Sequence, residues 1–148
     1  MKFEIKSRWD STLLFTCEAA SLGLAVKAAI KAGANLSGAD NAELIWAQTS
    51  ILPEGNIVGW KQCKNNVIVK LLIGQKIRRS NATGRKCRAE SVKVLRVFGA
   101  VEGVSIHDGK TTYRKGETVT CDSWEENRFV ECGGGIHFFL TRIEAENH

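Results

Sequence analysis

The change in hydrophobic periodicity near residue 51 limits the possible folds of this sequence more than any other feature. Before this point, apolar residues recur at the three- and four-residue spacing of an amphipathic helix, which we expect over residues 22–32. After it, β-branched runs and two-residue alternation predict strands, chiefly between residues 57 and 140. The sequence therefore predicts an α+β fold, mostly antiparallel sheet, with one N-terminal helix and a short C-terminal helix.

Most strands are expected in hairpins, at residues 3–7 and 13–17, 57–63 and 67–73, and 104–107 and 110–113. The run VIVKLLI in the second hairpin is nearly all apolar, which indicates a central strand covered on both faces. Asp108-Gly109 is suited to a two-residue type I′ turn, and a shift of alternation at Leu95 predicts a β-bulge. Thr141 and Glu144 form a capping box that begins the terminal helix.

The length of 148 residues fits one domain, 1–148, with a hairpin, helix and connector in 1–50 and a β-rich part in 51–148. Residues 34–40, ANLSGAD, have the small residue, Asn and Leu order of a pentapeptide-repeat unit. The next unit fails because Asn41 stands where leucine is required. A repeat coil needs several stacked units to bury a core, so we interpret this segment as a vestigial repeat that serves as a connector.

The composition, 43% hydrophobic and 25% charged, is that of a soluble globular protein. No apolar run approaches the ~20 residues of a membrane span, and the N-terminus does not read as a signal peptide, so we expect no membrane partner. The odd number of cysteines and the lack of a C-x-x-C pair indicate reduced thiols in the cytoplasm. The acidic residues show no metal-ligand spacing, and we expect neither a structural metal nor a cofactor.

The most concentrated chemistry lies in residues 75–90, QKIRRSNATGRKCRAE, which we call the basic stretch. Six of its residues are cations within thirteen positions that hold no acid, and without them the net charge of +5 becomes about −1. The turn between the cations offers backbone N–H groups and hydroxyls, which suits an anion at close range. We therefore expect an anion or nucleotide site here. The alternative is a solvated loop, since the stretch lacks the order of a P-loop.

The expected ligands of this site are Arg78, Arg79, Ser80, Asn81, Thr83, Arg85, Lys86 and Arg88, with Lys76 as the sixth cation, His137 nearby and Trp60 as a stacking partner. Trp124 is a second candidate for stacking on a base, although both tryptophans can equally fill a core. Cys132 would need a nearby base to act as a nucleophile, so we interpret it as a buried structural thiol.

Two histidines are the candidates for catalysis, although neither is firmly assigned. His137 follows three glycines and alternates with Ile136 and Phe138, so it faces the side opposite to theirs. If it shares a cleft with His107 and a Lys or Arg, the pair provides the acid and base for metal-independent phosphodiester cleavage. The alternatives are a satisfied core or sheet-face histidine for His137 and an exposed polar residue for His107.

From Ile51 onward, the order of short motifs resembles an uncharacterised domain of tailed-phage and large-virus proteins that follows a run of pentapeptide repeats. The motifs are ILPEG, GWKQC, IVKL, RRSNATGRKCRAE, VFGA, HDGK, YRKGETV and ECGGGIHFFLTRIEAE. The resemblance implies a phage origin and the host cytoplasm. It brings no established reaction and no named catalytic residues.

Three functions compete at this point. The first is a non-enzymatic phage protein that sequesters a phosphate-bearing small molecule, such as a nucleotide immune signal of the host. The second is a metal-independent nucleotide phosphodiesterase that uses His137 and His107. The third is a nucleic-acid or protein-binding module, for which six clustered cations are a short footprint. A symmetric homo-oligomer is also expected, because exposed strand edges can pair.

Overall fold

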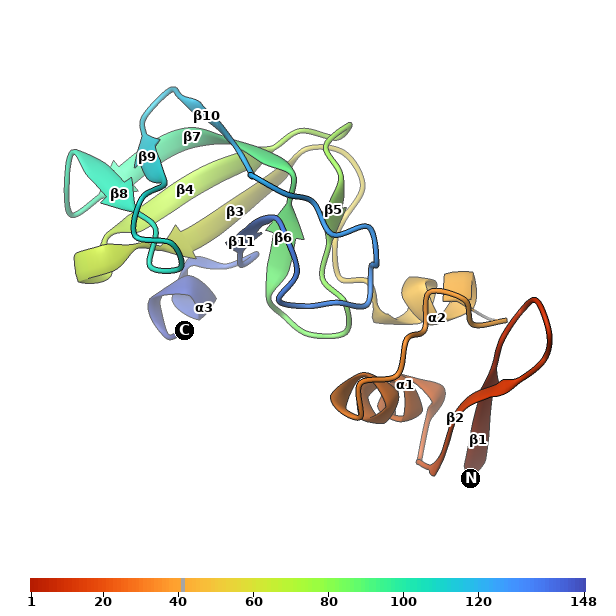
Figure 1. Ribbon diagram of the computed structural model, residues 1–148. Helices are drawn as coiled ribbons and strands as arrows, with labels where there is room; N and C mark the ends of the chain where they lie inside the picture. The colour runs from red at the N-terminus through yellow and green to blue at the C-terminus, as the bar shows by residue number, and fades with distance from the viewer. Residues whose placement is uncertain (41) are drawn as a thin grey trace.

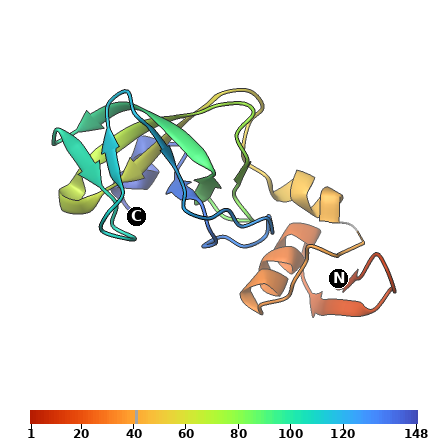
Figure 2. The same ribbon diagram turned by 45° about the horizontal axis from the view of Figure 1, so that its top comes forward.

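The computed structural model describes residues 1–40 and 42–148, so the predicted break of the repeat at Asn41 lies outside the described residues. Two lobes are visible, a small N-terminal lobe and a larger lobe formed by the rest of the chain (Figures 1 and 2). The small lobe contains β1 (Lys2–Lys6), β2 (Leu13–Glu18), α1 (Leu22–Lys31) and α2 (Ala42–Thr49). Its first three elements confirm the predicted hairpin and helix.

Helix α2 was not predicted. Ala42 and Ile45 are buried, whereas Leu44 is 51% exposed, so no continuous apolar stripe indicates a helix in the sequence. The helix is held by tertiary packing, because Ile45 belongs to a core cluster with Val26 and Leu36. Residues 34–40 form the expected connector before it.

The larger lobe is a set of antiparallel sheets with one short α-helix and a 3₁₀ turn at Lys64–Asn66, which confirms the predicted fold class. Its elements are β3 (Ile57–Gln62), β4 (Ile68–Ile73), β5 (Arg79–Ser80), β6 (Cys87–Ala89), β7 (Ser91–Phe98), β8 (Glu102–Val104), β9 (Thr112–Arg114), β10 (Thr118–Thr120), β11 (Ile136–Phe138) and α3 (Arg142–Glu146). The main sheet has the order β10-β7-β4-β3, beside a sheet β11-β6-β5 and the hairpin β8-β9.

Strand β4 is central, as the run VIVKLLI predicted, and it pairs with β3 and β7. The predicted bulge at Leu95 is confirmed, because Lys70 pairs with Arg96 and Leu71 already pairs with Val94. The capping box at the start of α3 is also present.

The two-residue turn predicted at Asp108-Gly109 is wrong. Strand β8 ends at Val104 and β9 begins only at Thr112, which leaves a longer loop between them. The Asp108 carboxylate accepts hydrogen bonds from the backbone N–H groups of Lys110 (2.9 Å) and Thr111 (3.1 Å). These local bonds replace ladder hydrogen bonds, so the residues before Asp108 form a loop and not a strand end.

One segment without strands, residues 121–135, ties the two lobes together. We call it the crossing loop, because it runs past β6 and β5 towards α2 (Figure 1). Its Phe129 is 5% exposed and packs in the core of the small lobe. Beside it, Arg128 forms an ion pair with Glu43 of α2 at 3.2 Å. The crossing loop therefore supplies part of the core of a lobe that is distant in sequence.

Candidate functional site

The structure does not collect the six cations of the basic stretch into one pocket. Arg88 is 1% exposed, and its guanidinium donates hydrogen bonds to four backbone carbonyls of the crossing loop. The acceptors are Glu125 (2.7 Å), Asn127 (2.7 Å), Val130 (3.0 Å) and Gly134 (3.2 Å). Burial lowers the pKa of Arg88. This guanidinium holds the crossing loop in place, so we no longer count it among the ligand groups.

Two polar residues of the predicted turn are also buried and have structural partners. Asn81 donates to the carbonyls of Thr49 (3.0 Å) and Gly84 (3.2 Å) and accepts from the N–H of Ile51 (3.2 Å). Ser80 donates from its hydroxyl to the carbonyl of Arg128 at 2.8 Å. These bonds connect the turn to the end of α2 and to the crossing loop, and they occupy the groups that were expected to bind an anion.

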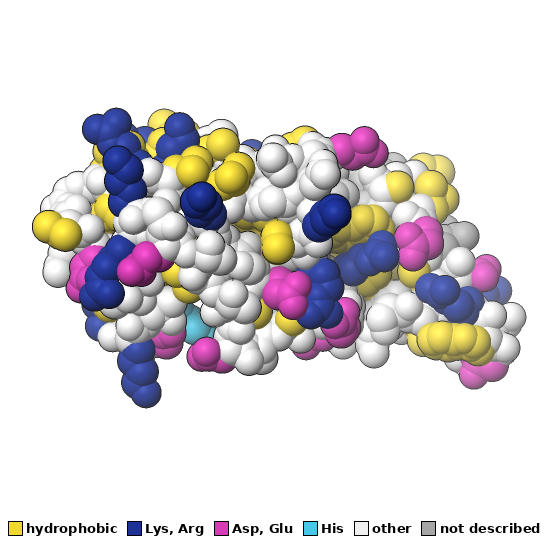
Figure 3. All heavy atoms as spheres, turned by 90° about the horizontal axis from the view of Figure 1, so that it is seen from above, with side chains coloured by type: hydrophobic (Ala, Val, Ile, Leu, Met, Phe, Trp, Pro, Cys, Tyr) yellow, Lys and Arg dark blue, Asp and Glu magenta, His cyan; other side chains and the backbone are white. Residues whose placement is uncertain are grey.

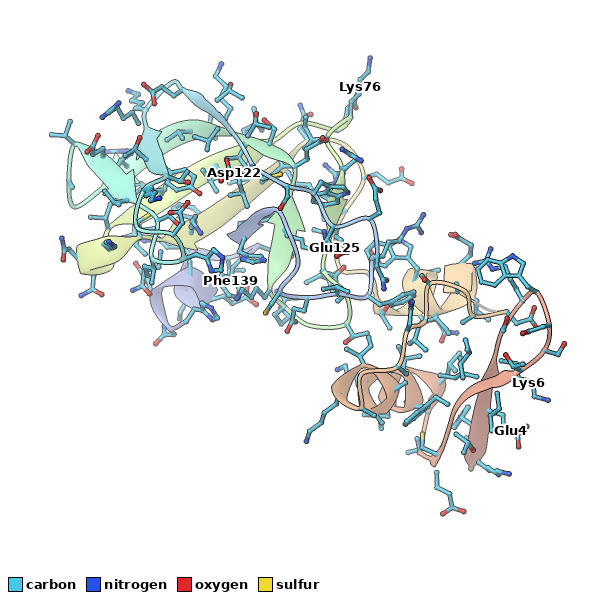
Figure 4. All side chains as sticks on the ribbon, in the orientation of Figure 1. Glu4, Lys6, Lys76, Asp122, Glu125 and Phe139 are labelled. Atoms are coloured by element: carbon cyan, nitrogen blue, oxygen red, sulfur yellow. The ribbon has the colours of Figure 1, made fainter. Side chains whose placement is uncertain are left out.

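The remaining cations point in different directions. Arg79 donates to the carbonyl of Pro53 at 2.9 Å, and Arg85 forms an ion pair with Glu144 of α3 at 2.5 Å. Lys76 projects away from the molecule at the turn between β4 and β5 (Figure 4). Seen from above, basic side chains are spread over the surface among acidic and apolar ones (Figure 3).

Three further predicted ligands lie apart from one another. Thr83 lines a shallow hollow beside α1, and Arg78 forms ion pairs with Glu90 and Glu126. Trp60 packs against Phe98, with ring centroids 6.0 Å apart. Trp60 does not reach the cleft that contains His137.

That cleft, which we call the histidine cleft, has a volume of about 360 Å³. It lies between the β8–β9 hairpin, β3, β11 and both ends of the crossing loop. The ionisable residues that line it are Lys61, His107, Asp108, Tyr113, Cys121, Asp122, Cys132 and His137. The structure therefore brings together the two histidines that the sequence singled out, from positions thirty residues apart.

His137 faces the cleft because β11 alternates. Ile136 and Phe138 are buried in the core of the larger lobe, which leaves the residue between them on the other face. The ring of His137 lies edge-on to that of His107, with centroids 6.2 Å apart. Its Nε2 atom is buried without a hydrogen-bond partner among the described residues. The alternative of a core or sheet-face histidine whose ring nitrogens are both hydrogen-bonded therefore does not describe His137.

Basic groups surround His137. Its pKa is lowered to about 4, mainly by burial and in addition by the charges of Lys86, Lys61 and His107. Lys61, on β3, donates from Nζ to the His137 carbonyl at 3.3 Å, and burial lowers its pKa as well. At neutral pH the ring of His137 is consequently uncharged, beside groups that repel one another and would be stabilised by an anion.

Cys132 is exposed, so the prediction of a buried structural thiol is wrong. It lies where the crossing loop passes the cleft, and its Sγ atom is 3.9 Å from Nζ of Lys86. Gly134 lets this part of the loop pass closely, because a Cβ atom there would be 2.6 Å from the carbonyl oxygen of Ser123. The glycines thus bring the loop against its own beginning and shape one wall of the cleft.

Lys61 and Tyr113 were missed by the sequence reasoning. Tyr113 is buried on β9, and Nζ of Lys61 lies 5.7 Å from its ring centroid. Both residues occur in ordinary strand patterns, and no local signal distinguishes them. Their place in the cleft follows only from the packing of β3 beside β9 and β11, which is a feature of the tertiary structure.

Neither a metal centre nor a membrane helix is present in the part of the chain that the structure describes. No group of three or more His, Cys, Asp or Glu residues there could hold a metal ion. No helix among residues 1–40 and 42–148 has the length and apolar character to cross a bilayer.

A family model matches more than half of the chain. The family model described as "Family of unknown function (DUF5758)" matches residues 48–145, which include all walls of the histidine cleft. No curated protein and no solved structure matches the chain.

Proposed function

The chain belongs to the family of unknown function DUF5758, and we propose from its own residues that it binds a phosphate-bearing small molecule in the histidine cleft. The observation that carries the proposal is the convergence of Lys61, His107 and His137 on one cleft, with Nζ of Lys86 3.9 Å from Sγ of Cys132 in the cleft lining. Charged and neutral N–H donors of this kind form strong hydrogen bonds to phosphate oxygens.

Two acidic residues line the cleft, the exposed Asp122 and Asp108. The carboxylate of Asp108 accepts hydrogen bonds from the backbone of Lys110 and Thr111 and from the Thr111 hydroxyl. These bonds hold its pKa well below its usual range, with the Thr111 hydroxyl as the largest cause. The carboxylate of Asp108 is therefore engaged by its own loop, while Nε2 of His137 has no hydrogen-bond partner within residues 1–40 and 42–148.

The volume of about 360 Å³ is at the lower end of the range for small-molecule sites and suits a mononucleotide or a small cyclic nucleotide. The ligand class we favour is a nucleotide signal that the protein sequesters without converting it. A phage origin and an anti-defence role in the host cytoplasm belong to the same proposal, and the motif order from Ile51 onward supports them.

Calorimetry with a panel of linear and cyclic nucleotides tests the proposal. Lys61→Met and His137→Gln should each weaken binding by roughly ten- to a hundredfold, the value of one charged or buried hydrogen bond. Lys76→Gln is the matched control, since Lys76 projects away from the cleft, and it should bind as the wild type does. The proposal fails if no member of the panel binds, or if both cleft variants bind like the wild type.

Phosphodiester cleavage is the second candidate, favoured by the 6.2 Å separation of the two histidine rings. The neutral ring of His137 would accept the proton of the attacking hydroxyl or water, and protonated His107 would donate one to the leaving oxygen. Incubation with cyclic nucleotides separates the two candidates. Linear product that disappears in His107→Ala would establish cleavage, whereas recovery of intact ligand would favour sequestration.

A further inference from the structure

A second hollow lies on the other side of the crossing loop, between β5 and α2. We call it the Trp–Arg groove; its volume is about 370 Å³. The residues that matter here are Trp46, Arg78, Arg79, Trp124, Glu126 and Arg128. Ser123 lines the histidine cleft, whereas the next residue, Trp124, lines the groove, so the loop separates the two sites.

Two pairs of an indole and a guanidinium form the groove. Cζ of Arg78 lies 5.6 Å from the ring centroid of Trp124, which the buried Arg88 approaches at 4.6 Å, and Cζ of Arg128 lies 5.4 Å from that of Trp46. The members of each pair come from different segments: Arg78 immediately precedes β5 and Trp46 lies in α2, whereas Trp124 and Arg128 belong to the crossing loop. Aromatic faces beside guanidinium groups are the surroundings in which nucleobases and their phosphates bind.

Two of the three carboxylates that pair with these arginines are exposed, whereas Glu90 holds Nε and Nη2 of Arg78 bidentately and its side chain is 32% exposed. Arg78 pairs with Glu126, whose side chain is 75% exposed, and Arg128 pairs with Glu43, whose side chain is 77% exposed. Ion pairs at such exposure contribute little, because water solvates both partners nearly as well. A phosphate group can therefore replace Glu126 on Arg78 or Glu43 on Arg128 at small cost, while Glu90 keeps its place on the other side of the Arg78 guanidinium.

We propose that the Trp–Arg groove binds a nucleoside monophosphate, with the base against an indole, the phosphate on Arg78 and Arg128, and Glu126 as an internal competitor. Two indoles favour a ligand that carries a planar ring over a simple inorganic anion. The volume fits one nucleotide, which favours this ligand over an extended strand. The site is independent of the histidine cleft and of the function proposed for it.

The test measures the binding of adenosine 5′-monophosphate by calorimetry and by tryptophan fluorescence. We expect saturable quenching by this nucleotide, with adenosine and ribose 5-phosphate each at least ~10-fold weaker, since each lacks one of the recognised groups. Equal binding of ribose 5-phosphate, or no binding at all, would overturn the proposal. A single-stranded oligoadenylate that binds far more tightly would also overturn it, in favour of nucleic acid.

Two substitutions in the groove should act in opposite directions. Glu126→Gln removes the competitor and should tighten binding a few-fold, by about half the effect of a charged hydrogen bond. Arg78→Gln should weaken binding ~10-fold. Glu54→Gln makes the same charge change as Glu126→Gln at an exposed position outside the groove, and should change binding little. If Glu126→Gln and Glu54→Gln have the same effect, the competitor role is refuted.

The histidine cleft could also take this nucleotide, and stoichiometry distinguishes the two sites. If both proposals hold, the wild type binds two nucleotides per chain and His137→Gln binds one, with the quenching retained. If only the groove binds, both proteins take up one. Loss of quenching in His137→Gln, at an unchanged unfolding temperature, would overturn the groove and assign the nucleotide to the cleft.

Discussion

The basic stretch and the histidine cleft differ in how sequence distance relates to distance in space. The stretch places six cations within thirteen residues, yet Arg88 points into the protein, Lys76 away from it and Arg85 towards α3. The cleft draws Lys61, His107 and His137 from three separate segments to one place. Neighbouring residues along a strand or turn point in different directions, whereas residues opposite each other on paired strands share a face. Whether functional side chains meet in one site therefore depends on which strands pair, and not on how closely the residues are spaced in the sequence.

Arg88→Met should have the largest effect on stability. It tests whether the basic stretch has a structural role. The substitution leaves four carbonyls of the crossing loop without their donor, and each lost buried hydrogen bond costs about 1 kcal/mol or more. We expect the free energy of unfolding to fall by more than about 3 kcal/mol in urea denaturation. A loss below about 1 kcal/mol would mean that water replaces the guanidinium and that the clamp is unimportant.

Asn81→Ala should have the next largest effect. It removes a donated bond to Thr49 of α2, an accepted bond from Ile51, and a donated bond to Gly84 within the turn itself. We expect a loss of about 2 kcal/mol in the free energy of unfolding. The matched control is Thr83→Ala in the same turn, which should change stability by no more than about 0.5 kcal/mol. Equal losses in the two variants would contradict the special role of Asn81.

The pH dependence of stability tests the surroundings of His137. Its pKa is lowered from the usual 6.5 to about 4 in the folded protein, so between these values the unfolded chain binds a proton that the folded one does not. The contribution of the buried neutral His137 to the free energy of unfolding is therefore complete above pH 6.5 and is lost as the pH falls towards 4. Urea midpoints measured across this window should show a shallower slope in His137→Gln than in the wild type.

His107→Gln provides the comparison for that experiment, since it removes an exposed imidazole from the same cleft. Most of the slope should remain in this variant, because burial is the largest cause of the shift at His137. A slope that is the same in His137→Gln and the wild type would assign the pH dependence to other groups.

Arg85→Gln should have the smallest effect. Arg85 pairs with Glu144 at 2.5 Å, but its side chain is 56% exposed. We expect a change of less than about 1 kcal/mol in the free energy of unfolding, which disappears at high salt. A larger loss that persists in salt would place Arg85 with Arg88 among the structural cations.

Local patterns in the sequence determined much of the fold. The hairpin of β3 and β4, the bulge at Leu95 and the capping box at Thr141 were all predicted, because each depends on residues that are near one another or on alternation within one strand. The same alternation placed His137 on the face opposite to Ile136 and Phe138. Helix α2 was missed because its stability comes from distant packing, including Phe129 of the crossing loop.

The chemistry of the individual polar groups was decided by the tertiary structure. The carbonyls that hold Arg88 lie 37 to 46 residues further along the chain, and the bond from Lys61 to His137 spans 76 residues. An arginine whose guanidinium faces water or a ligand cannot be distinguished in the sequence from one whose guanidinium is held by four carbonyls. The sequence by itself determined which residues carry charge and which strand faces they occupy. Burial and the partners across the fold decided which of them are free to bind, because hydrogen bonding and desolvation depend on neighbours in space.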